Sequence, residues 1–162
     1  MEIRHSEPRD IEAIRQIYTQ ASNFASTLQL PFPSAEVWQQ RLAIPRDSFY
    51  SLIACEGASV LGQIGIEVCT SPRRRHAANI GLAVSEQARR RGVGAALVAA
   101  AIELGTGWLG VRRIELETYT DNHAAIALFQ RHGFVVEGTA REYALRAGAF
   151  VDVLRMARLD KA

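Results

Sequence analysis

Hydrophobic residues follow two periodicities along this chain, one typical of strands and one typical of helices. Short β-like runs are expected to form strands at 2–5, 51–55, 60–68, 76–84 and 114–119. Among them, residues 114–119 alternate strictly between apolar and polar positions. Apolar residues at helical spacing follow in residues 11–18, 95–104 and 125–129. The pattern therefore predicts a fold in which helices and strands are mixed.

Local signals set several element boundaries. Ser34 is expected to cap a short helix that runs through Leu42, and Asn122 to cap a later helix that Gly133 ends. A last hairpin is expected to join residues 134–137 to residues 150–156 around Gly148. Between the first two helices, residues 23–33 carry two prolines and the apolar side chains Leu28, Leu30 and Phe32, so we expect a loop there. Such a loop can bind a ligand or pack over the core, and the sequence leaves both roles open.

Composition excludes several classes of protein. A chain of 162 residues, 48% hydrophobic and 22% charged, is expected to form one globular domain over residues 1–162. The formal net charge of +2 is only mildly basic, so we expect no nucleic-acid partner, although two arginine runs (73–75 and 89–91) keep that class as a minor alternative. No window approaches the roughly 18 apolar residues of a membrane span, and the first residues lack the apolar core of a signal peptide. We therefore expect a cytoplasmic protein with no membrane partner.

The cysteines do not indicate a redox or metal site. Cys55 and Cys69 show no C-x-x-C spacing and have no nearby pair of histidines. Both are expected to be buried, reduced thiols. No metal is expected.

The segment Arg89-Arg90-Arg91-Gly92-Val93-Gly94-Ala95 carries the strongest chemical signal of the chain, because it lies between a predicted strand and a predicted helix. Glycines at alternate positions let the backbone approach a ligand closely, and the first N–H groups of a helix have no intrahelical acceptor. Such a turn is suited to phosphate groups. An anionic ligand such as a pyrophosphate is therefore expected there.

Three phosphate-binding motifs compete for this turn. A dinucleotide fingerprint needs a third glycine three residues after the second, where this chain has Leu97. A nucleoside-triphosphate loop needs Gly-Lys-Ser/Thr, where this chain has Gly94-Ala95-Ala96 and so lacks both the lysine and the hydroxyl. The remaining pattern, Arg89-x-x-Gly92-x-Gly94-Ala95 entering a helix, resembles the acyl-coenzyme A loop of the GNAT N-acetyltransferase superfamily. A second element supports the resemblance: Asn122-x-x-Ala125-x-x-Leu128-Phe129-x-Arg131-x-Gly133-Phe134 is similar to the second cofactor-side helix of that family.

The resemblance covers nearly the whole chain and implies an α/β (α+β) fold, with a mixed, mostly antiparallel sheet of about seven strands flanked by helices. It also implies an acetyltransferase that uses acetyl-CoA, with the pantetheine arm against the backbone of the strand before the turn. For Arg90 and Arg91 a solvated surface role stays open, and Asn122 can cap its helix as well as contact the ligand. The residues implied in acetyl-CoA binding are Leu82, Val84, Arg89, Arg90, Arg91, Gly92, Val93, Gly94, Ala95, Asn122 and Phe129.

The chemistry that the family implies is attack of a neutral amine on a thioester, with a backbone N–H, here that of Leu82, stabilising the oxyanion. An α-amine with a pKa of roughly 8 is mostly protonated at neutral pH, so a base or a water chain must remove a proton. Where many members carry a tyrosine that protonates the leaving thiolate, this chain has Phe129, which leaves Tyr143, a water or unassisted departure as alternatives.

The general base also cannot be assigned by position, because this chain lacks the carboxylate that some members of the family use. Ala78 and Asn79 stand at the strand positions at which those members carry a carboxylate. Glu67, Glu117 and His76 remain as candidates, although an exposed strand face explains the two glutamates equally well and a surface position explains His76.

For the acceptor, candidates are the loop residues Leu30 and Phe32, the helix residues Trp38 and Arg41, and the last hairpin with Tyr143 and Asp152. Arg41 offers a cation for a carboxylate, whereas Trp38 can equally be a core residue. The stretches 27–42 and 143–152 also resemble a bacterial branch that acetylates free L-amino acids. We therefore expect a small-molecule primary amine as substrate, with antibiotics, polyamines, peptide N-termini or a non-catalytic acetyl-CoA sensor as alternatives, and a homodimer as in many members.

Overall fold

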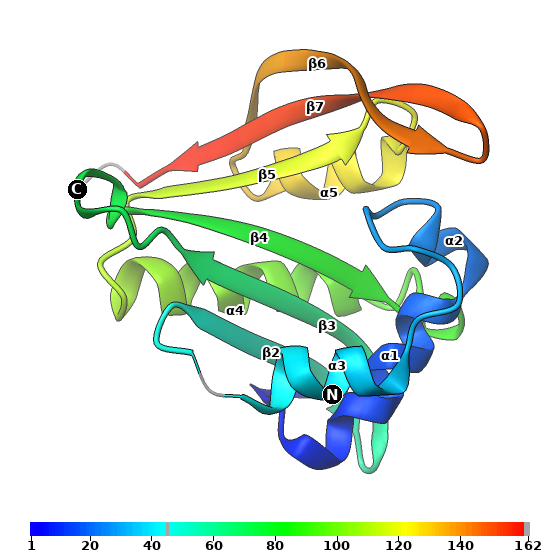
Figure 1. Ribbon diagram of the computed structural model, residues 1–162. Helices are drawn as coiled ribbons and strands as arrows, with labels where there is room; N and C mark the ends of the chain where they lie inside the picture. The colour runs from blue at the N-terminus through cyan, green and yellow to red at the C-terminus, as the bar shows by residue number, and fades with distance from the viewer. Residues whose placement is uncertain (45, 161–162) are drawn as a thin grey trace.

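Seven strands form one sheet in the computed structural model, which describes residues 1–44 and 46–160 (Figure 1). The strand order is β1-β2-β3-β4-β5-β7-β6, and every neighbouring pair is antiparallel except β4 and β5. This is the mixed, mostly antiparallel sheet that the sequence predicts. The strands are β1 (Glu2–His5), β2 (Phe49–Glu56), β3 (Ser59–Val68), β4 (Ala77–Val84), β5 (Arg113–Tyr119), β6 (Val135–Arg146) and β7 (Ala149–Leu159).

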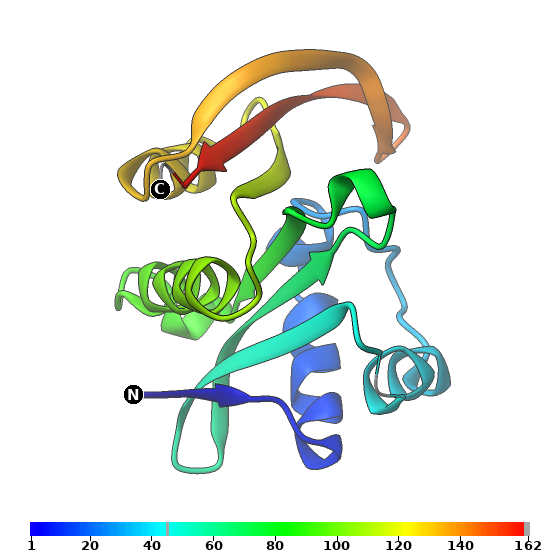
Figure 2. The ribbon, with the colours of Figure 1, turned by 90° about the vertical axis from the view of Figure 1, so that its left-hand side faces the viewer.

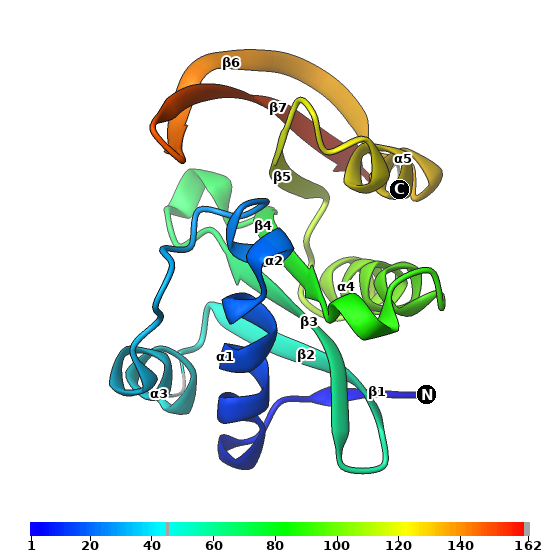
Figure 3. The same cartoon turned by 90° about the vertical axis from the view of Figure 1, so that its right-hand side faces the viewer.

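Helices cover both faces of the sheet (Figures 2 and 3). On one face lie α4 (Val93–Gly107) and α5 (His123–Arg131). On the other lie α1 (Ile11–Thr19), α2 (Ala21–Phe24) and α3 (Ala35–Ala43). Short 3-10 turns, η1 (Pro8–Asp10), η2 (Pro72–Arg74) and η3 (Glu86–Ala88), precede α1, β4 and the glycine turn.

Two hydrophobic clusters hold these layers together. Alternate residues of the central strands, such as Ile64 and Ile80, pack with Leu97 beneath α4. The alternate residues of β2 and β4 that point to the opposite face, such as Ile53, pack against Ile14 and the rest of α1. Because strand side chains alternate between faces, the two clusters together bury both sides of the N-terminal half of the sheet.

The sheet opens where β4 and β5 diverge. Only three residue pairs join them, from Ala77 with Arg113 to Asn79 with Glu115, and beyond these the strands separate toward their carboxyl ends (Figure 1). The remaining residues of both strands border a gap in the middle of the sheet.

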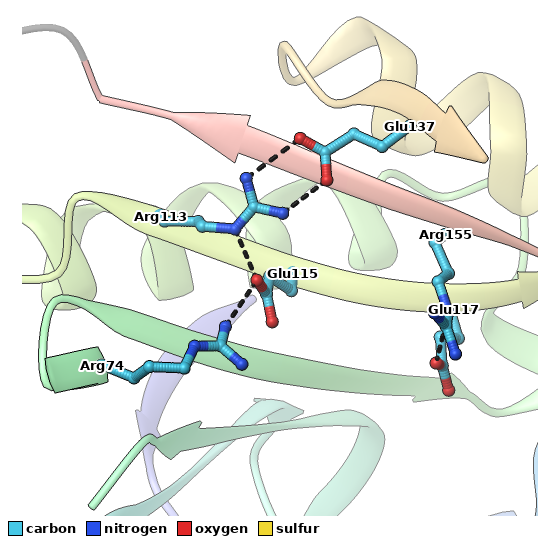
Figure 4. Close-up of polar contacts among 6 residues, drawn as sticks. All are labelled: Arg74, Arg113, Glu115, Glu117, Glu137 and Arg155. Atoms are coloured by element: carbon cyan, nitrogen blue, oxygen red, sulfur yellow. Dashed lines mark hydrogen bonds and ion pairs between the residues drawn. The ribbon is translucent and has the colours of Figure 1, made fainter. Parts of the chain in front are cut away.

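Ion pairs fasten the closed end of this gap (Figure 4). Glu115 accepts hydrogen bonds from Arg74 of η2 at 2.7 Å and from Arg113 at 2.5 Å, and Arg113 also binds Glu137 of β6. Burial acts to raise the pKa of Glu115, but the two arginines outweigh burial and lower it. The network therefore ties η2, β5 and β6 together at the end from which the strands diverge.

Three expectations need correction. The last hairpin is longer than 134–137 and 150–156, because β6 continues through two irregularities in its pairing with β7, around Gly138 and Glu142. Residues 23–24 belong to the short helix α2 and not to the loop. Both cysteines are free and Cys55 is buried, but Cys69 is only half-buried because β3 ends one residue before it.

No helix within the described residues is long and apolar enough to cross a bilayer. Across residues 1–44 and 46–160, no group of three or more His, Cys, Asp or Glu side chains is arranged to hold a metal ion.

Candidate active site

The backbone of β4 presents unpaired groups to the gap. The Ser85 N–H donates to a carbonyl of β3 at 2.8 Å, whereas the His76 carbonyl accepts from N–H groups at the start of β5 at 2.8 and 3.0 Å. Odd-numbered residues of β4 therefore bond to β3, and even-numbered ones face β5. Since pairing with β5 ends at Asn79, the backbone groups of Leu82 and Val84 face the gap. These are the two residues whose backbone the family resemblance implies in ligand binding.

Asn23 occupies one of the backbone groups at the edge of β4. Its amide nitrogen donates to the Val84 carbonyl at 3.0 Å and to the Ile17 carbonyl at 2.9 Å, and the side chain is buried. With the Val84 carbonyl bonded, the gap retains the N–H groups of Leu82 and Val84 and the carbonyl of Leu82. An extended ligand with amide groups of its own can pair with such a set.

The glycine turn forms a cradle at the start of α4. Gly92 precedes the helix with φ +81, a left-handed conformation that favours glycine. The first hydrogen bond of the helix runs from the Ala96 N–H to the Gly92 carbonyl at 3.0 Å, and within the described chain no protein oxygen accepts from the N–H groups of residues 92–95. Because these donors lie at the positive end of a 15-residue helix, the turn suits a pyrophosphate.

Gly94 serves close packing at the same place. A Cβ there would lie 3.1 Å from Leu128 of α5 and 3.7 Å from the side chains of Leu82 and Val84. The missing side chain therefore lets α4 approach both α5 and the edge of the gap. Val93 is buried, and Ala95 is half-buried at the surface of the turn.

The three arginines of the turn point to different partners. Arg89 donates to Ser22 at 2.6 Å and to Asn23 at 2.9 Å, so its guanidinium links the turn to α2. Arg91 donates from Nη2 to both carboxylate oxygens of Glu56, at 2.8 and 3.0 Å, whereas Arg90 is exposed with φ 59. The sequence could not assign these partners, because both contacts join segments far apart in the chain.

Helix α5 supplies the opposite wall of the gap. The Asn122 side chain accepts from the Ala125 N–H at 3.2 Å, which confirms that it caps the helix, and it also lines the cleft. Phe129 lines the cleft and is 6% exposed, with its ring 5.5 Å from that of Phe134. An apolar ring therefore stands on the cleft wall at the position where many family members have a tyrosine.

A cleft of about 390 Å³ passes through the sheet at the gap. On the α4 and α5 side it is lined by Leu82, Leu116, Asn122 and Phe129. On the other side its lining comes from the opposite faces of the strands and from α1, α3 and the loop after α2. Two molecules can therefore meet at the gap from opposite faces of the sheet. The residues on this second side include Tyr18, Leu28, Trp38, Arg41, Gly65, Glu67, Asn79, Gly81, Glu117 and Tyr143.

Both candidate glutamates line this second side. Glu117 of β5 accepts from the Tyr143 hydroxyl at 2.5 Å and lies 3.5 Å from Arg155 (Figure 4). Glu67 of β3 accepts from Ser48 at 3.0 Å. The hydrogen bond to Glu117 raises the pKa of Tyr143, so this phenol keeps its proton above its usual range. His76, the third candidate, is exposed in the turn just before β4 and lies outside the cleft lining.

An aromatic wall with one cation borders the glutamates. Trp38 is 5% exposed and lies 4.8 Å from the Tyr18 ring, so it is a core residue whose edge also lines the cleft. The guanidinium of Arg41 lies 5.4 Å from the Trp38 ring and donates to Gln29 at 3.1 Å. Beneath them, Tyr18 donates to Gln63 at 2.8 Å, and burial raises the Tyr18 pKa to about 12. Tyr18 is therefore a neutral donor throughout the neutral range.

Other predicted acceptor residues lie elsewhere. Leu30 and Phe32 are 79% and 96% exposed and do not line the cleft, whereas Leu28 of the same loop does. Asp152 accepts the Glu142 N–H at 2.8 Å and so fixes the irregularity in β6. The loop is anchored across the cleft, because the Tyr119 hydroxyl donates to the Thr27 carbonyl at 3.1 Å.

Sequence reasoning missed several cleft residues, chiefly Gly65, Gly81, Gln63, Tyr18 and Tyr119. For the two glycines a signal was available, since glycine inside a strand often marks a place where a ligand or another backbone approaches closely. For the others the pattern offers no signal beyond that of an ordinary core residue.

Comparisons with known proteins agree with this geometry. The acetyltransferase (GNAT) family model matches residues 11–134. The chain is 46% identical over 157 residues to the L-amino acid N-acetyltransferase AaaT of Escherichia coli (strain K12), and the match covers 97% of this chain and 96% of that protein.

Solved structures show the same fold. A ribosomal-protein-alanine N-acetyltransferase from Brucella melitensis superimposes with a TM-score of 0.87 at 27% identity, covering 98% of this chain and 99% of that chain. A GNAT superfamily phosphinothricin acetyltransferase from Sinorhizobium meliloti, in complex with AcCoA, gives a TM-score of 0.87 at 23% identity, covering 98% and 87%. The chain therefore belongs to the acetyltransferase (GNAT) family and is an N-acetyltransferase.

Proposed function

We propose that this enzyme transfers the acetyl group of acetyl-CoA to the α-amine of free L-amino acids in a ternary complex. The observation that carries the proposal is the cleft through the sheet, which is open to a donor on one face and to an amine on the other. The relative from Escherichia coli, an L-amino acid N-acetyltransferase, supports the choice of amino acids.

Residues on the donor side fit coenzyme A. The N–H groups of residues 92–95 suit the pyrophosphate, and the free N–H of Val84 and the carbonyl of Leu82 suit the amides of the pantetheine arm. Bound there, acetyl-CoA supplies an activated acetyl thioester. The Leu82 N–H then donates to the thioester oxygen, where negative charge develops as the amine attacks.

On the acceptor side, Arg41 and Glu117 have different roles. Arg41 is the cation that binds the substrate carboxylate. Glu117 removes a proton from the ammonium group, directly or through a water molecule, and Tyr143 holds its carboxylate in place. We favour Glu117 over Glu67 because it lies on β5, at the border of the gap, whereas Glu67 lies one strand behind β4. Phe129 has no proton to give, so thiolate departure depends on water or on Tyr143.

The test is acetyl-CoA turnover across an amine panel of L-amino acids, polyamines, aminoglycosides and peptides with free N-termini, followed by thiol release. We expect L-amino acids to give the highest kcat/KM, and Arg41→Met to raise KM about tenfold or more for amino acids but not for their decarboxylated amines. Preference for another amine class would overturn the acceptor assignment. Saturable acetyl-CoA binding without thiol release for any amine would indicate a sensor.

We further propose that the protein acts in the cytoplasm as a homodimer formed through β6. This strand is an edge of the sheet, and Val135 and Leu145 on it are 61% and 64% exposed, as is Phe150 of β7 at 67%. An edge strand with exposed apolar side chains pairs readily with another copy. Light scattering is expected to give twice the 17.8 kDa chain mass, and Leu145→Lys to give a monomer. A monomer in the unaltered protein would refute the dimer.

A further inference from the structure

Two glycines lie opposite each other in the middle of the sheet. Gly65 of β3 and Gly81 of β4 are cross-strand partners. Glycine inside a strand is unfavourable, because it loses more conformational freedom on folding than other residues and has no side chain to pack. Neither residue has a positive φ, so backbone conformation does not require glycine at either position.

Packing within the protein does not require Gly81 either. Gly62, which is also on β3, shows the opposite case, because a Cβ there would lie 3.0 Å from the Ala83 carbonyl oxygen and 3.1 Å from Leu97. A Cβ at Gly81 would meet nothing within 4 Å. The place that its side chain would take is therefore open space.

This open space belongs to the acceptor side of the cleft. Cross-strand partners direct their side chains to the same face of a sheet, and Gly65 and Gly81 both line the cleft. A Cβ at Gly65 would lie 3.0 Å from the Phe49 ring, which borders the same space. Gly81 thus forms the floor of a hollow in the sheet, and Gly65 lets the Phe49 ring lie close against β3 at the side of that hollow.

The hollow lies beside the reacting groups of the proposed mechanism. Asn79 pairs with Glu115 across β4 and β5, so two residues further along Gly81 and Glu117 stand at the same level on either side of the gap. Gly81 also directly precedes Leu82, whose N–H faces the gap. The face of the sheet that carries the Cβ position of Gly81 is also the face from which an amine would approach a carbonyl held by that N–H.

We propose that the Gly65–Gly81 pair determines acceptor specificity by making room for amines on a branched carbon, such as α-amino acids that carry a side chain. This inference rests on the proposed function and names a feature of its substrate. An amine on an unbranched CH₂ group, as in glycine or β-alanine, needs less of this room. A methyl group at position 81 occupies this space and so lowers kcat/KM for the branched acceptors.

The test compares Gly81→Ala with the unaltered enzyme, using L-leucine and L-alanine against glycine and β-alanine. We expect the ratio of kcat/KM for L-leucine to that for glycine to fall about tenfold. Where glycine turns over too slowly, its inhibition constant against L-leucine replaces its kcat/KM. Gly65→Ala, which displaces the Phe49 ring, is expected to lower the same ratio.

Gly138→Ala is the matched control, because Gly138 also lies in a strand with nothing within 4 Å of its Cβ position but stands on β6, outside the cleft lining. It is expected to leave the ratio unchanged. Thermal melting of each variant checks the fold, and KM for acetyl-CoA checks the donor side.

The outcomes separate the two proposals. If the unaltered enzyme acetylates no α-amino acid, the proposed function fails, and this inference fails with it. If it acetylates amino acids but Gly81→Ala lowers activity equally for branched and unbranched acceptors, or not at all, only the role of the glycine pair is overturned.

Discussion

Replacing Glu117 by glutamine tests the proton path most directly. The substitution keeps the size of the side chain and a group that can accept from Tyr143, but it removes the charge and the ability to take a proton. General bases contribute about 10²–10⁴-fold to rate, and the lower end of that range is appropriate because water can also reach this partly exposed carboxylate. We therefore expect kcat to fall about a hundredfold at pH 7, which corresponds to about 2.7 kcal/mol.

The pH profile distinguishes loss of a base from a structural defect. Between pH 7 and pH 9 the neutral fraction of an amine with a pKa of roughly 8 rises about tenfold, so the deficit of Glu117→Gln should narrow as pH rises. In the unaltered enzyme Tyr143 does not complicate the profile, because its hydrogen bond to Glu117 raises the pKa of the phenol.

The assay is steady-state thiol release with saturating acetyl-CoA, from pH 6 to pH 9.5. Glu67→Gln serves as the comparison, since this carboxylate lines the same side of the cleft but lies further from the gap, and we expect a smaller loss. Activity of Glu117→Gln within twofold of the unaltered enzyme at pH 7 would remove Glu117 from the mechanism. A deficit that is constant across the pH range would assign it a purely structural role.

Three further predictions concern other parts of the molecule. Gly94→Val should raise KM for acetyl-CoA at least tenfold, because even a Cβ lies 3.1 Å from Leu128 and displaces the wall of the gap; an unchanged KM in a folded variant would refute the cradle. Phe129→Tyr should raise kcat if departure of the thiolate limits turnover. If kcat does not rise and does not depend on solvent viscosity, departure of the thiolate is not the limiting step. Hydrogen bonds from Arg4, at 2.8 and 2.9 Å, are the main cause that lowers the pKa of Asp10. The stability that Asp10 contributes is therefore present above its ordinary pKa near 4 and is lost as pH falls through the folded value. Asp10→Asn should therefore melt with a weaker dependence on pH between about 5 and 3 than the unaltered protein, and identical slopes would contradict this linkage.

What the sequence predicted correctly was mostly local in the chain. The glycine turn, the cap at Asn122 and the cap at Ser34 depend on a few neighbouring residues, whose conformational preferences are visible in the pattern. The family resemblance extended these local signals to a whole fold, and the structure and comparisons confirm it.

The features that could not be predicted from the sequence depend on contacts between distant segments of the chain. Asn23 reads as a loop residue, but the fold places it against the Val84 carbonyl, 61 positions further along the chain. The importance of Gly81 appears only when its register with Gly65 and the open space at its own Cβ position are known. In the loop after α2, prolines and apolar residues indicated exposure correctly, but they could not show that Leu28 faces the cleft and Phe32 does not.

The divergence of β4 and β5 has a consequence for the dynamics of the sheet. Backbone amides in a central strand normally exchange with solvent slowly, because neighbouring strands protect them. The amides of Leu82 and Val84 face the gap, so we expect them to exchange faster in the free protein than the amides of β4 that bond to β3. A ligand that occupies the gap slows them, and these two amides thereby report its presence from the centre of the molecule.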